Sequence, residues 1–585
     1  MGEVYMNFHY TDERNVQMLI YLMKKKGIRK VVASPGTTNI SFLASIQSDP
    51  FFEIISSVDE RSAAYIACGM AAESGETVAL TCTGATASRN YLPGLTEAFY
   101  RKLPILAITS TQPTGRVGQN IPQVIDRSIV PIDAVKMTVQ IPMIRDDEDY
   151  KACNILINKA LLEIRHNGIG PVHVNLTTMY SKNFSVKNLP KTRNIERFTQ
   201  NDTLPELKSD HVGIYVGAHV KWSKQLSDAV DLFCKGYNAV VFCDQTSNYK
   251  GQFAVPISLV CNQDMYRSSL RTMDVMIHIG EVSGAYSTMN PKAVWRVSDD
   301  GELKDTFGKL KNIFQMSELN FFELYSKNVK NNQNDDSYLR AWKLENEELY
   351  NNIPKLPFSN IWIAEKMSSK LPEKSVLHLG ILNSLRSWNF FEVPKSVLGY
   401  SNTGGFGIDG GVSSLVGASI ADPSKLFFGV FGDLAFFYDL NVNGNRFIGN
   451  NIRILLINNG GGMEFKNYNN EGSMFGKSVN DYIAASGHFG NKSRELVKDF
   501  VENLGFQYIS ADSKDEFMNK IDLFTTGNQT SKPLVFEVFT NSEDESRALW
   551  LMRNIKHTHL GRFEHLGKKV LGDKGIRLVK HILNK

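Results

Sequence analysis

The sequence predicts an α/β protein built of three doubly wound parallel sheets, and two observations lead to this class. Short apolar runs rich in β-branched residues alternate with helix-length segments, which is the pattern of parallel strands covered by helices on both faces. Two polar stretches, 178–205 and 328–336, interrupt this alternation and divide the chain into three parts. The length of 585 residues agrees, because it corresponds to about three to five domains.

The first part, residues 1–185, begins with a helical pattern over residues 15–25. Strand-like runs follow at 30–33, 52–56, 77–83, 105–109 and 171–176. The polar stretch 178–205 has few apolar positions, and we interpret it as a linker.

The second part, residues 205–340, has candidate buried strands at 212–216, 239–242 and 275–279. After the polar stretch 328–336, which we expect to be exposed, a helix containing Trp342 is expected. The third part, residues 355–550, has its strands at 425–431, 452–457 and 533–539.

A basic tail, residues 551–585, follows the third part. From Arg553 onward it holds nine Lys or Arg and two Asp or Glu. This excess indicates either a solvated helix face or a contact with a phosphate or another anion.

Composition narrows the function classes. With 65 basic and 61 acidic residues, the net charge of +4 argues against a nucleic-acid binder. The six cysteines show no C-x-x-C spacing, so they predict free thiols in a reducing compartment and not a zinc site or a disulfide framework. No apolar run of about 18 residues or more predicts a membrane span, and the N-terminus has no apolar signal core. We therefore expect a cytoplasmic protein.

Two strand ends in the third part carry the strongest chemical signal. The apolar run 426–431 ends in Gly432-Asp433, and the run 454–457 ends in Asn458-Asn459-Gly460-Gly461-Gly462. Both ends are expected at the carboxyl edge of one sheet, where α/β proteins bind ligands. Carboxylate, amide and carbonyl oxygens suit Mg²⁺, and a helix N-terminus after Gly432 suits a diphosphate. Taken singly, Gly-Asp is typical of a helix cap and Asn-Asn-Gly of a turn; together, at this spacing, they favour the ligand site.

This pair of motifs resembles the diphosphate- and metal-binding motif of thiamine-diphosphate (ThDP) enzymes. That family also needs a glutamate on a second cofactor-binding domain, and Glu60 in Val58-Asp59-Glu60-Arg61 matches it. Ser34-Pro35-Gly36 upstream and Gly84-Ala85-Thr86 downstream fit the same layout. The resemblance implies a pyrimidine-binding domain (1–185), a central domain (205–340) and a diphosphate- and Mg-binding domain (355–550).

Within this family the chain is most similar to the menaquinone-pathway synthases that make 2-succinyl-5-enolpyruvyl-6-hydroxy-3-cyclohexene-1-carboxylate (SEPHCHC synthases). Beyond the motifs above, the similar stretches are Gly170 to Asn175, Gly407-Ile408-Asp409-Gly410, and Gly432 to Asn441.

The resemblance implies roles for individual residues. Glu60 would hydrogen-bond the aminopyrimidine ring, Gln123 would lie near the nucleophilic centre, and Asp433, Asn459 and Gly461 would hold Mg²⁺. Ile408 would support the bent cofactor, although core packing is the alternative for this residue. The implied cofactor-binding set is Ser34, Pro35, Gly36, Glu60, Gly84, Ile408, Gly432, Asp433, Leu434, Asn459, Gly461 and Phe465.

The implied substrate pocket departs from the family pattern. SEPHCHC synthases act on 2-oxoglutarate and isochorismate, whose carboxylates need Arg or Lys partners. Uncharged residues stand where the family has these cations: Thr37 and Thr38, Gln112, Thr403, Trp388, and, less securely aligned, Ala285-Tyr286. Ser384, Arg386, Gln123 and Phe465 complete the implied pocket. Five losses of charge favour a less anionic substrate.

We therefore expect a ThDP- and Mg²⁺-dependent carboligase that decarboxylates a small 2-oxo acid, with pyruvate the default, and transfers the acyl carbanion to an unknown acceptor. The alternatives are an authentic SEPHCHC synthase, a relative of acetolactate synthase or pyruvate oxidase, and a non-catalytic ThDP-binding protein. FAD is not expected, because Gly213 and Gly217 alone are a weak nucleotide-binding signal. The family places its active sites between two chains, which implies a homodimer or tetramer.

Overall fold

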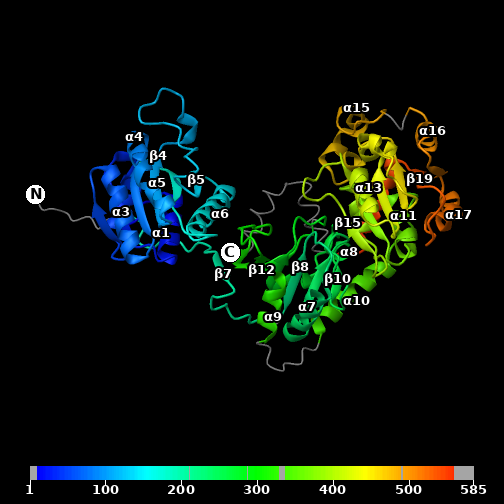
Figure 1. Cartoon of the computed structure of the whole chain (residues 1–585), viewed down its shortest axis with the longest axis horizontal. Coiled ribbons are helices and arrows are strands. Elements are labelled where there is room, and N and C mark those ends of the chain that lie inside the picture. Colours follow the sequence, from blue (N-terminus) through cyan, green and yellow to red (C-terminus); the bar gives the residue numbers. More distant parts are fainter. Residues whose placement is uncertain (1–8, 210, 286, 328–335, 489–491, 559–585) are drawn as a thin grey trace, which may run out of the picture. The chain divides into compact units, whose positions relative to one another are not determined.

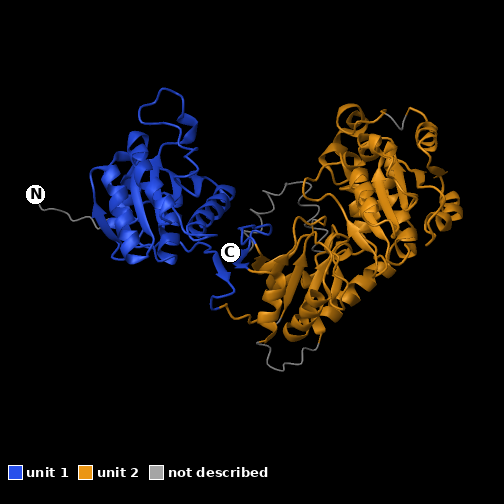
Figure 2. Ribbon diagram, viewed as in Figure 1, with its two compact units in different colours: residues 1–203, 300–315 blue, residues 204–299, 316–585 orange. Residues whose placement is uncertain are grey.

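The computed structural model describes residues 9–209, 211–285, 287–327, 336–488 and 492–558 (Figure 1). The chain divides into two compact units (Figure 2). The first unit contains residues 1–203 and 300–315, and the second contains residues 204–299 and 316–585. Three sheets covered by helices confirm the α/β class.

The first sheet has six parallel strands in the order β2-β1-β3-β4-β6-β5. Successive residues of one strand point to opposite faces of the sheet, so Val31 packs in one hydrophobic cluster and Val32 in the other. One cluster includes residues of α1, α2 and α6, and the other includes residues of α3 and α5, so the sheet is doubly wound. The strands are β1 (Lys30–Ala33), β2 (Glu53–Ser56), β3 (Val78–Thr83), β4 (Ile105–Thr111), β5 (Met137–Ile141) and β6 (Val172–Thr177), and the helices are α1 (Arg14–Lys25), α2 (Ile40–Gln47), α3 (Glu60–Ser74), α4 (Ala85–Asn90), α5 (Leu92–Tyr100) and α6 (Asp147–Glu163).

The second unit opens with parallel strands in the order β10-β9-β8-β11-β12. Trp342, on the helix expected from the sequence, is fully buried and packs edge-on against Phe242. The strands are β8 (Val212–Val216), β9 (Ala239–Cys243), β10 (Ala254–Pro256), β11 (Thr272–Ile279) and β12 (Asn290–Ser298), with helices α7 (Lys224–Tyr237), α8 (Ser258–Cys261), α9 (Glu318–Lys327) and α10 (Ser337–Asn351).

The third sheet repeats the strand order of the first, as β15-β14-β16-β17-β19-β18. All its strands are parallel. They are β14 (Val376–Leu379), β15 (Leu398–Tyr400), β16 (Phe427–Gly432), β17 (Ile452–Asn458), β18 (Gln507–Ala511) and β19 (Leu534–Phe539). The helices are α11 (Asn360–Met367), α12 (Asn383–Trp388), α13 (Gly411–Ala421), α14 (Asp433–Tyr438), α15 (Val479–Tyr482), α16 (Leu496–Asn503), α17 (Lys514–Phe524) and α18 (Ser542–Arg553).

The stretch 178–205 is not simply a linker, because it contains the strand β7 (Glu196–Thr199). β7 pairs in parallel with β13 (Leu310–Gln315) in the first unit. Its few apolar residues hold it there: Ile195 is fully buried, and the ring of Phe198 stacks on that of Phe314. A stretch with few apolar residues is therefore compatible with a short strand and does not by itself indicate a linker.

Several expectations fall partly outside the described residues. Residues 328–335, Tyr286 and residues 559–585 of the basic tail lie outside them, whereas 551–553 belong to α18. Of the helices that the structure describes, none has the length and apolarity required to span a bilayer.

Candidate active site

Ser34-Pro35-Gly36 and Gly84 follow two adjacent strands of the first sheet, β1 and β3. In the order 2-1-3-4, the carboxyl ends of the first and third strands form the switch point where α/β sheets bind ligands. A Cβ atom on Gly36 would lie 2.6 Å from the Cβ of Thr83, so only glycine lets the two strand ends approach this closely. Ser34 is fully buried, and its hydroxyl has no partner among the described residues.

Asn39, which the sequence analysis did not single out, holds this edge together. Its side chain is fully buried, and its Oδ1 accepts hydrogen bonds from the hydroxyls of Thr81 (2.7 Å) and Ser110 (3.2 Å). Its amide also donates to the carbonyl of Ser34 at 3.4 Å. One amide therefore ties the Ser34 loop to β3 and β4. A polar residue three positions after a turn glycine gave no recognisable signal in the sequence.

Glu60 is the first residue of α3, directly after the cap residue Asp59, whose carboxylate accepts from the backbone N–H of Arg61. The Glu60 carboxylate accepts one hydrogen bond, from the Asn90 amide at 3.2 Å, and the side chain is partly exposed. It therefore keeps acceptor capacity for a ligand.

Gln123 lies in the exposed loop after β4. Its φ of 65° is in the left-handed region that a residue with a side chain seldom occupies, and such conformations cluster at functional sites. In the same loop the guanidinium of Arg116, an exposed residue, donates to the Gln112 side chain. Arg116 therefore places a cation beside Gln112.

Asp433 connects the ends of β16 and β17, which are neighbours in the third sheet. Its carboxylate is 4% exposed and accepts hydrogen bonds from the backbone N–H groups of Leu434 (2.9 Å) and Gly460 (2.8 Å). Burial raises the pKa of Asp433 to about 6, although these N–H groups and that of Gly461 oppose the rise. A bound cation would stabilise the ionised form of this buried carboxylate.

The two adjacent asparagines have different positions. Asn458 is buried and donates to Glu537 at 2.7 Å, so it belongs to the sheet. Asn459 is half-buried, and its side chain has no hydrogen-bond partner among the described residues. A Cβ on Gly461 would lie 2.4 Å from Ser486 Oγ, which keeps this loop close to the 484–486 segment. The carboxylate, amide and carbonyl oxygens of Asp433, Asn459 and Gly461 are hard donors that fit Mg²⁺.

The donor set contains one carboxylate only. Consistent with this, no group of three or more His, Cys, Asp or Glu side chains suited to a metal occurs within the described part of the chain.

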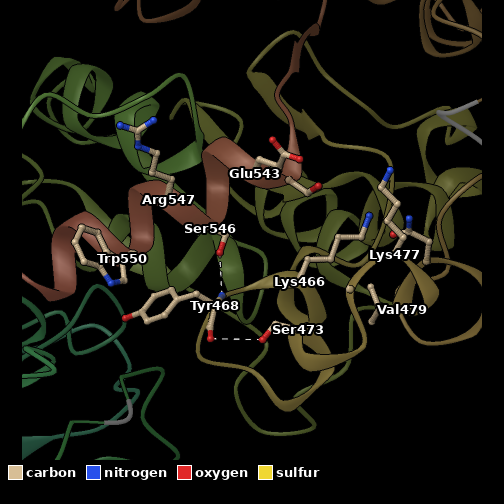
Figure 3. Close-up of a pocket in the computed structure, with 12 residues that line it drawn as sticks. Lys466, Tyr468, Ser473, Lys477, Val479, Glu543, Ser546, Arg547 and Trp550 are labelled. Carbon is tan, nitrogen blue, oxygen red and sulfur yellow. Dashed lines mark hydrogen bonds between the residues drawn. The ribbon is translucent and has the colours of Figure 1, made fainter. Parts of the chain in front are cut away.

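A cavity of about 590 Å³ lies beside the loop that follows Gly461 (Figure 3). Lys466, Lys477 and Arg547 give it a basic lining, with Glu543 the one acidic residue. Figure 3 shows how Tyr468 joins its two sides: its backbone N–H donates to Ser546 on α18 at 2.9 Å. Lys466 donates to Ser486 at 2.9 Å, and burial lowers its pKa while the charge of Asp433 opposes this.

Two apolar residues expected at the cofactor are accessible to solvent. Ile408 is partly exposed and Phe465 is 40% exposed, so neither side chain is buried in the core of the single chain.

Arg386 lines a second cavity of the second unit, of about 160 Å³. Its guanidinium makes two hydrogen bonds to Glu464, Nη1 to Oε2 at 2.7 Å and Nη2 to Oε1 at 2.8 Å. The other arginine of this cavity, Arg553, is paired with Asp264 at 2.8 Å. Both cations are therefore neutralised, and the rest of the lining is uncharged: Ser258, Asn262, Gly284, Ala285, Leu382, Asn389, Phe390, Phe406 and Asn469.

Three other residues expected in the substrate pocket are buried and bonded within the protein. The Thr38 hydroxyl contacts that of Thr83 at 2.5 Å and donates to Ser110 O at 3.0 Å. Ser384 accepts from the Asn360 amide at 3.2 Å, and the Thr403 N–H donates to Ser401 O at 2.8 Å. Thr37 and Pro35 are exposed.

Known proteins resemble this chain along most of its length. Residues 14–130 match the family model described as thiamine pyrophosphate enzyme, N-terminal TPP binding domain. The SEPHCHC synthase of Bacteroides fragilis is 31% identical over 562 residues, which cover 92% of this chain and 98% of the relative. The Bacteroides thetaiotaomicron synthase is 30% identical, with the same shares covered, and the Flavobacterium johnsoniae synthase is 26% identical over 90% of this chain and 95% of the relative.

Among solved structures, the ThDP-dependent 4-hydroxybenzoylformate decarboxylase of Rhodococcus jostii is 15% identical. The match covers 90% of this chain and 99% of that chain, with a TM-score of 0.39.

Proposed function

The chain belongs to the SEPHCHC synthase family of thiamine-diphosphate enzymes, and from this premise we propose that it is a ThDP- and Mg²⁺-dependent carboligase. It decarboxylates a small 2-oxo acid and transfers the acyl carbanion to an acceptor that carries less negative charge than isochorismate. Two observations support the proposal: the chain keeps the residues of both cofactor motifs, and both arginines of the cavity around Arg386 are paired with carboxylates.

The residues at the two sheet edges fit the two ends of the cofactor. Asp433, Asn459 and the Gly461 carbonyl would hold Mg²⁺, and the turn at Gly432, where β16 ends and α14 begins, would lie next to the diphosphate. Glu60 and the close-packed turns at Gly36 and Gly84 would receive the pyrimidine end. When bound, the cofactor stabilises the negative charge left on the acyl carbon as CO₂ departs.

The work of this chain's own residues is binding and proton positioning. Glu60 would present its carboxylate to a ring nitrogen of the cofactor's pyrimidine and would hold or share a proton there. Partly exposed Ile408 and Phe465 would shape an apolar surface near the reacting carbon. Gln123, in its left-handed loop conformation, would orient the substrate.

The cavity around Arg386 supports the choice of acceptor. A carboxylate ligand needs an unpaired cation, and each such contact is worth about 1.5–3 kcal/mol. Here Arg386 and Arg553 already have carboxylate partners, while Asn262, Asn389 and Asn469 offer both donors and acceptors. Such a lining suits hydroxyl and carbonyl groups better than a dianion.

Location and assembly form part of the proposal. All six cysteines are free thiols, which supports a reducing compartment such as the cytoplasm. We further propose a homo-oligomer in which one chain supplies Glu60 and its partner supplies Asp433, with no nucleic acid or membrane involved.

The decisive experiment incubates the protein with ThDP, Mg²⁺ and a panel of 2-oxo acids and measures CO₂ release. Release from pyruvate or another small 2-oxo acid is expected, and Glu60→Gln should slow it at least tenfold because proton sharing with the ring is lost. The absence of release from every member of the panel, or wild-type rates in the variant, would contradict the proposal.

One second candidate has a specific observation in its favour. Identity of 31% to a named SEPHCHC synthase over 98% of its length supports the same reaction. Turnover of 2-oxoglutarate with isochorismate at rates above those of pyruvate would decide for it and against the neutral acceptor.

A further inference from the structure

A small cavity inside the first unit lies under the Gln123 loop and apart from the two cavities described above. It lies between α4, α5 and the strands β4 and β6, and its volume is about 20 Å³. That space accommodates one particle the size of a water molecule or a monoatomic ion. Its polar lining includes Ser88, Arg89, Thr109, Arg127 and His173.

Arg127 is the unusual member of this lining. Its side chain is only 3% exposed, and its Nη2 donates a hydrogen bond to Asn175 Oδ1 at 2.5 Å. The Nε and Nη1 groups are buried and have no partner within the described residues. A buried guanidinium is stable only if its N–H groups are bonded and its charge is balanced.

Arg127 lies close to a second cation, Arg89, and to the buried Cys82 thiol. Burial lowers the pKa of Arg127 to about 10, and the nearby charge of Arg89 acts in the same direction. Arg89 itself donates to the backbone carbonyl of Asp126 at 2.9 Å and not to a carboxylate. Among the described residues, Arg127 forms no ion pair. Arg127 therefore borders the cavity without a paired carboxylate, whereas the charge of the exposed Arg89 interacts with the Asp126 carboxylate.

His173 contributes to the cavity as a neutral group. Burial, together with the charges of Arg127 and Arg89, lowers the pKa of His173 to about 3. Its Nε2 is 2.7 Å from Thr109 Oγ1, and its Nδ1 is buried without a partner in the described structure. The imidazole thus adds a polar contact without changing the charge balance.

We infer that this cavity binds a monoatomic anion of the halide class, chloride under ordinary conditions, through the free N–H groups of Arg127. The unbonded N–H groups of Arg127 and the small volume of the cavity both favour this ligand.

The anion would act on the loop that carries Gln123. Arg127 lies four residues after Gln123, and its bond to Asn175 attaches the loop to β6. It also lies close to Gly84, because a Cβ there would be 3.3 Å from Arg127 Cζ. Filling the cavity would therefore fix both the loop and the glycine turn at the switch point. This role is independent of which substrate the enzyme uses.

The test uses the full-length protein without substrate. Crystals soaked in sodium bromide should give an anomalous bromine peak next to Arg127, which decides the matter without any variant. In solution, raising chloride tenfold at constant ionic strength, with gluconate as the replacement anion, should raise Tm by about 2–4 °C.

Matched variants assign the effect to the cavity. Arg127→Met should abolish the chloride-dependent rise in Tm, whereas Arg116→Met, in an exposed position of the same loop, should keep it. A water molecule in place of bromine next to Arg127, or equal chloride responses in wild type and Arg127→Met, would overturn the inference. If Arg127→Met does not fold, the bromine peak in wild type still decides.

Discussion

At Asp433 a buried carboxyl group accepts hydrogen bonds from two strand ends, yet its pKa is raised to about 6 by burial. A folded-state pKa above the unfolded value means that the protonated form is favoured in the fold. Protonated Asp433 therefore makes its full contribution to the stability of the folded state below about pH 3.8, and this contribution is lost as the pH rises through 6. In the metal-free protein, ionised Asp433 therefore costs about 3 kcal/mol at pH 7.5.

This gives a prediction for Asp433→Asn. Without metal, the variant should be more stable than wild type at pH 7.5 and should lose most of that advantage at pH 5, where wild-type Asp433 is largely protonated. Mg²⁺ with ThDP should raise the wild-type Tm more at pH 7.5 than at pH 5 and should leave the variant unchanged. Thermal unfolding at both pH values measures this. Equal Mg²⁺-dependent rises in variant and wild type would show that Asp433 is not the metal ligand.

The pair between Arg386 and Glu464 leads to a second prediction at the residue scale. Glu464→Gln removes the carboxylate that neutralises Arg386 and leaves a cation facing the cavity. The ratio of kcat/KM for 2-oxoglutarate to that for pyruvate should rise about tenfold, because a charge-assisted contact becomes available. The control is Glu471→Gln, an exposed change in the neighbouring segment. An unchanged ratio would mean that Arg386 does not meet the substrate.

At the scale of elements, most strands follow from the sequence because a buried parallel strand is a continuous apolar run. The run at 212–216 coincides with β8, and those at 30–33 and 452–457 match β1 and β17 within a residue. β7 was missed because it is an edge strand with few apolar residues, chiefly Phe198 and the preceding Ile195. Local pattern cannot reveal a strand whose partner, β13, lies more than a hundred residues away.

The residues of the candidate site also fall into two groups: those that the local sequence predicts and those that it does not. Gly432, Asp433 and Asn459 could be placed from the sequence because each follows a recognisable strand. Asn39, Arg116, Glu464 and Arg127 could not, because their importance depends on contacts made by the folded chain. Glu464 in particular changes the interpretation of Arg386 from an available cation to a neutralised one.

The turn at Gly36 carries a prediction for one element. Gly36→Ala places a methyl group 2.6 Å from Thr83 Cβ, so the turn between β1 and α2 must move. The expected result is a loss of about 1–3 kcal/mol in the free energy of unfolding together with weaker ThDP binding, measured by denaturant unfolding and calorimetry. Gly69→Ala is the matched control: nothing lies within 4 Å of its Cβ, and on helix α3 it should stabilise by about 0.5–1 kcal/mol. Unaltered ThDP affinity in Gly36→Ala would remove the turn from the site.

At the scale of the whole molecule, the first and third sheets share one strand order. Glu60 belongs to the first unit and Asp433 to the second. Each sheet therefore carries one half of the proposed cofactor site, and the assembly must bring the halves together. We propose that the two halves come from different chains, and variants studied singly do not test this.

Mixing two inactive variants, Glu60→Gln and Asp433→Asn, provides that test. In a mixed dimer, one site combines both substitutions, while the other combines the intact Glu60 of one chain with the intact Asp433 of its partner. Random reassociation after mild dissociation should restore about a quarter of wild-type CO₂ release, because half the dimers are mixed and each has one intact site. The control is each variant taken through the same procedure alone. If each site uses both residues of one chain, every site in the mixture keeps one substitution, and activity stays at the level of the separate variants.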